Sequence, residues 1–116
     1  MIYGSGKPLR QFIYGTDLAY LILWVLYNYN EPEPIILSVD EADEVSIADV
    51  AIMIAKAMNF TGNIVFDTTK ADGQYKKTAS NAKLRTYLPD YKFKSIKDGI
   101  QEACDWFTNH YDEARK

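Results

Sequence analysis

Residues 4–14 read Gly-Ser-Gly-Lys-Pro-Leu-Arg-Gln-Phe-Ile-Tyr, and this stretch leads from a loop into the first helix. Its glycines and proline predict a loop over residues 1–10. The aromatic and β-branched residues Gln11 to Tyr14 predict a short strand. Asp17 is a good helix-capping residue, so a helix is predicted to start there and to end at Asn28. This helix is apolar nearly all round, which predicts burial on most of its faces.

The elements further along the chain are predicted from apolar periodicity, helix caps and turn residues. Ser46 and Ser95 each begin a Ser-x-x-Asp version of the capping box. The predicted elements are strands at 35–39 and 64–66, helices at 46–59, at 80–88 and from 95 onward, and a polar surface loop at 68–78. In total the sequence predicts four helices and three or four short strands. This α/β pattern suits an α+β domain or the trailing part of an α/β protein.

The composition excludes several classes of protein. The chain has 116 residues, which suits a single domain over residues 1–116, and a net charge of -3. Domains that bind nucleic acid usually carry excess positive charge on one face, so no nucleic-acid partner is expected. The longest apolar run, residues 18–27, is about half of what a membrane-spanning helix needs. The single cysteine, Cys104, and the lack of a visible signal peptide predict a cytoplasmic location.

Matches to catalytic and cofactor motifs near Met1 fail because of their surroundings. Tyr3 and Lys7 have the Tyr-x-x-x-Lys spacing of short-chain dehydrogenases, which requires a helix to place both side chains on one face. The glycines and Pro8 disfavour a helix there. Gly6-Lys7 lacks the other residues of a phosphate-binding P-loop, and Gly4-x-Gly6 lacks the third glycine of a dinucleotide fingerprint. The sequence therefore predicts no catalytic and no cofactor-binding residues.

Acidic residues and the lone histidine are better explained by structure than by metal chemistry. Residues 40–44 contain four carboxylates, but neither a histidine nor a glycine-bent calcium loop accompanies them. His110 stands alone near the end of the last predicted helix. Cys104 falls on the apolar face of that helix and is predicted to be a core thiol. No metal site is predicted.

Arg10 and the loop around Asp72 are the best candidates for ligand binding. Arg10 lies between the glycine loop and an aromatic segment, where a guanidinium could bind a phosphate with two hydrogen bonds. Asp72 can accept hydrogen bonds from two sugar hydroxyls or from the amino-imino edge of guanine. The strongest local positive cluster suits an anionic small ligand and comprises Lys70, Lys76, Lys77, Lys83 and Arg85.

Residues 4–14 together with Asp17-Leu18-Ala19 resemble a run found in extended short-chain dehydrogenase/reductases that act on nucleotide sugars. Residues 33–39, 66–74 and 76–90 narrow the resemblance to the GDP-L-fucose synthase family, over essentially the whole chain. Its members epimerise C3 and C5 of GDP-4-keto-6-deoxy-D-mannose and then reduce C4 with NADPH. The resemblance implies that this chain is the C-terminal, substrate-binding part, without the N-terminal Rossmann domain that holds NADP(H) and the catalytic groups.

The family's substrate contacts carry over to particular residues. They are an aromatic residue before Gly-x-Gly, an arginine seven residues later and the aspartate of an Asp-Gly loop, which here are Tyr3, Arg10 and Asp72. Tyr3 replaces a tryptophan of other members and keeps a ring for stacking. Lys77 would add a cation to the nucleotide site. The resemblance also implies a homodimeric parent, a chain inactive by itself, and an exposed apolar patch where the Rossmann domain docks.

Two alternatives stay open at this point. The chain could be the same part of another nucleotide-sugar epimerase or dehydratase, although the loop Asp-Gly-Gln-x-Lys-Lys at residues 72–77 favours GDP-L-fucose synthases. It could also be a stand-alone interaction module without catalysis, in which case nucleotides would not change its stability.

Overall fold

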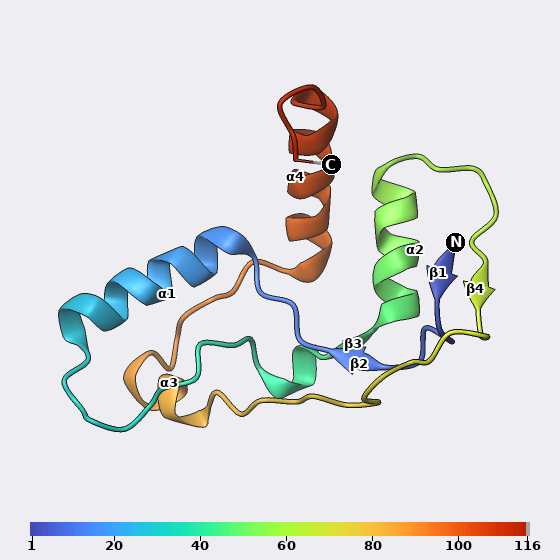
Figure 1. Ribbon diagram of the computed structural model, residues 1–116. Helices are drawn as coiled ribbons and strands as arrows, with labels where there is room; N and C mark the ends of the chain where they lie inside the picture. Colours follow the sequence, from blue (N-terminus) through green and yellow to red (C-terminus); the bar gives the residue numbers. More distant parts are fainter. Residues whose placement is uncertain (116) are drawn as a thin grey trace.

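The computed structural model describes residues 1–115, and its shape is elongated. The radius of gyration is 16.6 Å, whereas a compact domain of this length has about 13 Å. Figure 1 shows the reason, because α1 (Gly15–Asn28) extends to one side, away from the pair α2 (Ile47–Ala57) and α4 (Ile96–Asn109). The short α3 (Ala82–Tyr87) contacts α1 through an edge-to-face pair of aromatic rings. Among the described residues, no helix is long and apolar enough to cross a membrane.

The strands of the described chain are two residues long and form two separate pairs. β1 (Ile2–Tyr3) pairs in parallel with β4 (Phe66–Asp67). β2 (Leu9–Arg10) pairs antiparallel with β3 (Val45–Ser46), which follows a short 3-10 helix, η1 (Glu41–Asp43). Both pairs therefore fasten the N-terminal ten residues to later parts of the chain.

Two of the strands predicted from sequence are wrong, and a third is displaced. Residues 11–14 and 35–39 form no strand, because among the described residues no other strand lies beside them to accept backbone hydrogen bonds. The apolar character of the second segment still has a role, since Val39 is buried. The strand predicted at 64–66 is found at β4, because Phe66 and Asp67 are the residues that meet β1.

The four predicted helices are confirmed, and the two capping boxes explain where two of them begin. The Ser46 hydroxyl accepts a hydrogen bond from the Asp49 N–H at 3.0 Å at the start of α2. The Ser95 hydroxyl accepts one from the Asp98 N–H at 3.1 Å at the start of α4. Each cap satisfies an N–H group that has no partner within its helix. The helix predicted at 80–88 is shorter than expected and spans only α3.

The first helix differs from its prediction in its start and in its burial. α1 begins at Gly15, so Asp17 lies in the first turn and does not cap it. The Asp17 carboxylate instead accepts hydrogen bonds from the Tyr91 hydroxyl at 2.6 Å and the Lys94 N–H at 2.9 Å. Leu21 is fully buried, but much of the helix is uncovered. Its apolar side chains that are more than half exposed are Tyr20, Ile22, Leu23, Leu26 and Tyr27.

This apolar face of α1 is the kind of exposed patch that the sequence predicted. A helix that is apolar all round is normally covered on most sides, and here the covering elements reach only the side that carries Leu21. Burial on most faces is therefore wrong for the described chain. Large exposed apolar patches usually mark a surface that another element covers.

A network around Asp40 joins the segment before η1 to α3 and to the segment that leads into α4. Arg85 Nε and Nη2 donate to the two oxygens of Asp40 at 2.8 and 2.6 Å, and Asn81 Nδ2 donates to the same carboxylate at 2.8 Å. Arg85 Nη1 also donates to the Tyr91 carbonyl at 2.6 Å. Asn81 is the buried polar residue of the described chain, and its amide is satisfied here and by the Ser38 carbonyl.

The Asp40 network predicts how stability depends on pH. The hydrogen bond from Arg85, and then that from Asn81, lowers the pKa of the Asp40 carboxyl from its ordinary value of 3.8. The unfolded chain then takes up the proton more readily than the folded one, so this stabilisation is present above pH 3.8 and is lost as the pH falls through the folded pKa. We expect the stability difference between wild type and Asp40→Asn to be constant between about pH 5 and 7 and to shrink below about pH 4. Urea unfolding at a series of pH values measures it, and a difference unchanged at low pH would contradict the assignment.

Candidate functional site

The candidate site is formed by two chain segments that run side by side in the same direction. Residues 2–10 lie along residues 66–77, and the two are joined by the β1–β4 pair at one end. At the other end Leu9 forms a parallel bridge with Lys76 and donates its N–H to the Tyr75 carbonyl at 2.8 Å. In Figure 1 the second segment can be followed from β4 along the lower side of the molecule toward β2. All four residues predicted to contact a ligand lie on these two segments.

Asp72 is held against the glycine loop. Its Oδ2 accepts a hydrogen bond from the Ser5 hydroxyl at 2.7 Å, and its Oδ1 accepts one from the Ser5 N–H. These hydrogen bonds, the side-chain one first, lower the pKa of the Asp72 carboxyl. Gly4 makes the approach possible, since its φ of +88° lies in the left-handed region and a Cβ there would collide with Asp72 Oδ1. The carboxylate is thus ionised, exposed and fixed in direction.

Arg10 reaches across to the loop that carries Asp72. Its Nη2 donates to the Gln74 carbonyl at 2.8 Å and its Nη1 donates to the carbonyl of Leu9 at 2.6 Å. A guanidinium has five N–H donors, so donors remain for a further partner. Arg10 therefore binds the loop to which Asp72 belongs. The side chain of Arg10 is half-buried where β2 ends.

Tyr3 and Lys77 flank this centre and are both exposed. Tyr3 has 67% of its surface exposed, and Lys70 Nζ lies 5.8 Å from the centre of its ring. Lys77 follows Lys76, whose bridge partner Leu9 directly precedes Arg10. An open ring and open cations suit a flat, anionic ligand.

The structure divides the positive cluster that the sequence showed. Lys76 pairs with Glu44 at 3.4 Å, Lys83 pairs with Glu31 at 2.7 Å, and Arg85 pairs with Asp40. The last two lie away from the parallel segments and have structural partners. Lys70 and Lys77 of this cluster remain, and Lys7 and Arg10 on the first segment are further cations of the candidate site.

Sequence reasoning missed Ser5, and it named Lys70 only as part of the positive cluster and Gln74 only as part of the 72–77 loop. In the structure each of the three contacts a predicted site residue. Ser5 stands between two glycines with positive φ, at 88° and 74°. Such a loop exposes backbone N–H groups that can bind anions. That pattern was the available signal for Ser5, whereas its pairing with a residue 67 positions away was not visible in the sequence.

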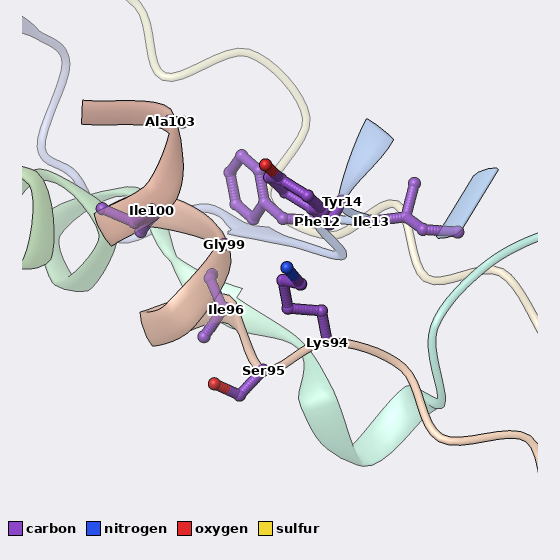
Figure 2. A pocket seen from close by; sticks show the side chains of 9 residues that line it. All are labelled: Phe12, Ile13, Tyr14, Lys94, Ser95, Ile96, Gly99, Ile100 and Ala103. Carbon is purple, nitrogen blue, oxygen red and sulfur yellow. The ribbon is translucent and has the colours of Figure 1, made fainter. Parts of the chain in front are cut away.

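A separate cavity at the start of α4 is an alternative site, but it is small. Figure 2 shows Lys94 directed toward Tyr14 beside Phe12 and Gly99. The cavity measures about 160 Å³, below the roughly 300 Å³ at which sites for small-molecule ligands begin. Its one ammonium group is already paired with Glu102 and lies 4.6 Å from the centre of the Tyr14 ring. This cavity cannot hold a nucleotide sugar.

The remaining candidates from sequence have structural roles in the described chain. Cys104 is confirmed as a buried free thiol, and burial raises its pKa. His110 stacks on Trp106 at the end of α4, with ring centres 4.9 Å apart. Within residues 1–115, no group of three or more His, Cys, Asp or Glu side chains could hold a metal ion.

The glycine loop of this chain does not have the form of a dinucleotide fingerprint. A dinucleotide fingerprint leads from a strand through three glycines into the N-terminus of a helix, which binds the pyrophosphate. Here Gly4 and Gly6 lead into Pro8 and β2, and the space where Gly4 would admit a phosphate is taken by Asp72. A carboxylate in that position repels the pyrophosphate.

Comparisons with known proteins bear on the family resemblance. No protein-family model matches the chain. A probable GDP-L-fucose synthase of Drosophila melanogaster is 58% identical over 115 residues, which are 99% of this chain and 36% of that protein. The chain matches one segment of GDP-L-fucose synthases. The GDP-L-fucose synthase of Dictyostelium discoideum is 59% identical over the same shares of the two chains.

Solved structures of GDP-L-fucose synthases confirm the fold. A crystal structure of a GDP-L-fucose synthetase from Naegleria fowleri has a TM-score of 0.96 and 53% identity, and the match covers 99% of this chain and 35% of that one. A structure of the same enzyme bound to NADP also has a TM-score of 0.96. The chain thus spans about a third of the length of the GDP-L-fucose synthases it matches. The α/β prediction and the predicted resemblance are both confirmed.

Proposed function

We propose that the chain is the GDP-sugar-binding segment of a longer GDP-L-fucose synthase. The whole enzyme would epimerise GDP-4-keto-6-deoxy-D-mannose and reduce it with NADPH. The proposal rests on one observation above all, which is that the two parallel segments gather Tyr3, Arg10, Asp72 and Lys77. The similarity to GDP-L-fucose synthases over nearly the whole chain supports it. In this proposal residues 1–116 act as one substrate-binding unit.

Each of these side chains would recognise a different part of a GDP-sugar. The guanidinium of Arg10, together with Lys77, would bind diphosphate oxygens through charge-assisted hydrogen bonds. Asp72 would accept hydrogen bonds from a pair of adjacent donors, and the exposed ring of Tyr3 would stack on a flat or apolar face. These residues bind and orient the substrate, and they neither hold NADP(H) nor move hydride. NADP(H) and the catalytic groups would belong to the remaining part of the enzyme.

The same proposal accounts for the uncovered face of α1. The apolar side chains of this helix, from Tyr20 to Tyr27, would pack against the Rossmann part of the longer enzyme. A homodimeric parent in the cytoplasm stays a prediction from the resemblance, and light scattering with cell fractionation would test it.

The substrate of the full-length protein tests the proposed function. We expect NADPH oxidation with GDP-4-keto-6-deoxy-D-mannose and little with the corresponding dTDP- or UDP-linked keto sugars. We also expect the 116-residue chain alone to oxidise no NADPH and to bind GDP-sugars no more tightly than micromolar. Equal turnover of dTDP- or UDP-linked sugars would favour another nucleotide-sugar enzyme. If no nucleotide sugar changes the thermal stability of the folded full-length protein, the result would favour an interaction module.

A second candidate comes from one structural neighbour. A GDP-6-OMe-4-keto-L-xylo-heptose reductase of Campylobacter jejuni has a TM-score of 0.77 and 26% identity over 94% of this chain. Including a GDP-linked keto-heptose among the substrates would separate this activity from that of GDP-L-fucose synthases.

A further inference from the structure

We propose that Ser5 is a positioning residue for Asp72. Ser5 fixes the orientation of the Asp72 carboxylate, so that the outer lone pairs of its oxygens point toward two adjacent donors of the ligand. This inference rests on the proposed function, because it concerns the GDP-sugar site described above.

The first support is the geometry of the Ser5–Asp72 pair. Ser5 binds both carboxylate oxygens, with its N–H on Oδ1 and its hydroxyl on Oδ2 at 2.7 Å. Two hydrogen bonds from one residue fix the plane of a carboxylate, whereas a single bond would leave it free to rotate. Asp72 is otherwise on an exposed loop, so this pair sets the direction of its side chain.

The second support is that the Ser5 hydroxyl has a fixed direction of its own. It accepts a hydrogen bond from the Lys7 N–H at 3.2 Å. With that N–H occupying a lone pair, the hydroxyl proton is directed to Asp72. The chain from Lys7 through Ser5 to Asp72 is therefore polarised toward the carboxylate.

The third support is the way the chain around the pair is built. Gly4 and Gly73 both have positive φ, at 88° and 70°. A side chain at Gly4 would collide with Asp72, so the backbone is shaped to bring the carboxylate onto Ser5. At the far end of the same loop, Arg10 binds the Gln74 carbonyl at 2.8 Å. The loop is thus held at Asp72 and again at Gln74.

What remains of the carboxylate defines the ligand chemistry. An ionised carboxylate has about four acceptor positions, and Ser5 occupies one on each oxygen. The outward positions suit two donors side by side. In a GDP-sugar such a pair is found in neighbouring hydroxyls of a sugar or in the amino-imino edge of guanine. A fixed carboxylate binds such a pair more tightly than a mobile one, because no rotational freedom is lost on binding.

Steady-state kinetics of the full-length protein test the inference with four variants, Ser5→Ala, Ser5→Thr, Asp72→Asn and the double variant Ser5→Ala/Asp72→Asn. We expect Ser5→Ala to raise KM for the GDP-sugar about 3- to 10-fold with kcat unchanged, the effect of one lost hydrogen bond. Ser5→Thr keeps the hydroxyl and should stay within about 2-fold of wild type. In the Asp72→Asn background, Ser5→Ala should add less than about 2-fold, because the two residues act as one unit.

Competing nucleotides identify which donor pair Asp72 binds. Inosine diphosphate lacks the guanine amino group but keeps N1–H, and GDP lacks the hexose but keeps the two ribose hydroxyls. If guanine is the partner, Asp72→Asn should weaken the binding of GDP more than that of inosine diphosphate. If the ribose is the partner, Asp72→Asn should weaken both nucleotides equally. If the hexose is the partner, Asp72→Asn should weaken the GDP-sugar but not GDP.

Other outcomes separate this inference from the proposed function. If Asp72→Asn raises KM but Ser5→Ala does not, the positioning role is wrong and the GDP-sugar site stands. If Ser5→Ala and Ser5→Thr both lower the thermal midpoint, and the effects of Ser5→Ala and Asp72→Asn multiply, Ser5 has only a structural role. If the wild-type protein accepts no GDP-sugar, the proposed function and this inference fall together.

Discussion

Arg85→Ala is expected to destabilise the folded chain by about 2–3 kcal/mol, the sum of a lost charged pair and carbonyls left without a donor. The guanidinium binds both oxygens of Asp40 and the Tyr91 carbonyl, so it joins three parts of the chain. Its side chain is 25% exposed and that of Asp40 is 40% exposed. Because water reaches the pair, the loss should be smaller than the 3–5 kcal/mol of a fully buried pair.

Urea unfolding followed by tryptophan fluorescence measures this loss, and Lys83→Ala is the matched control. Lys83 lies on the same helix and pairs with Glu31 at 2.7 Å, but it holds no backbone carbonyl in place. The two side chains of this pair are 35% and 40% exposed, so its removal should cost less than the loss of Arg85. Equal losses in the two variants would mean that Arg85 acts as an ordinary surface charge.

The helices of this fold could be predicted from the sequence because their signals are local. Ser46 and Ser95 bind N–H groups three residues away, and these short-range bonds place the starts of α2 and α4. The strands could not be predicted as well, because a strand exists only where another lies beside it. The segment 35–39 has the composition of a buried strand, yet within residues 1–115 nothing pairs with it. The location of the exposed apolar face on α1 could not be predicted for a similar reason, because burial also depends on which elements pack against the helix.

The candidate site was predicted in part for a similar reason. Arg10 and Asp72 could be selected from residue type and loop context. In the structure, Arg10 binds the Gln74 carbonyl in the loop that carries Asp72, and Asp72 binds Ser5. The contact between Ser5 and Asp72 spans 67 positions in the sequence and depends on the backbone of Gly4. A single sequence contains no signal for a contact at that separation. The ligand contacts stay predictions for Tyr3, Arg10, Asp72 and Lys77. The largest effect on substrate binding is expected from a substitution of Arg10.

Arg10→Ala in the full-length protein is expected to raise KM for the GDP-sugar by about 10- to 100-fold, the effect of losing a charge-assisted hydrogen bond to phosphate. The guanidinium already binds the carbonyls of Leu9 and Gln74, and these bonds hold its plane and leave other donors for a ligand. A preformed fork of this kind matches two phosphate oxygens, which a lysine ammonium cannot do. Arg10→Lys should therefore recover only part of the loss.

Lys77→Ala is compared with Arg10→Ala, because both residues are proposed to contact the diphosphate. Lys77 is exposed and forms no ion pair within the described residues, so its loss should raise KM by less than about 3-fold. The thermal midpoint separates binding from folding, because Arg10 also ties down the loop at Gln74. Two results together would show that the guanidinium binds phosphate. KM rises in Arg10→Ala without a change in the thermal midpoint, and added salt weakens substrate binding by the wild type, so that the difference in KM between the two proteins becomes smaller. If KM is unchanged in Arg10→Ala, the diphosphate is bound elsewhere, and the two parallel segments contact only the sugar or the base.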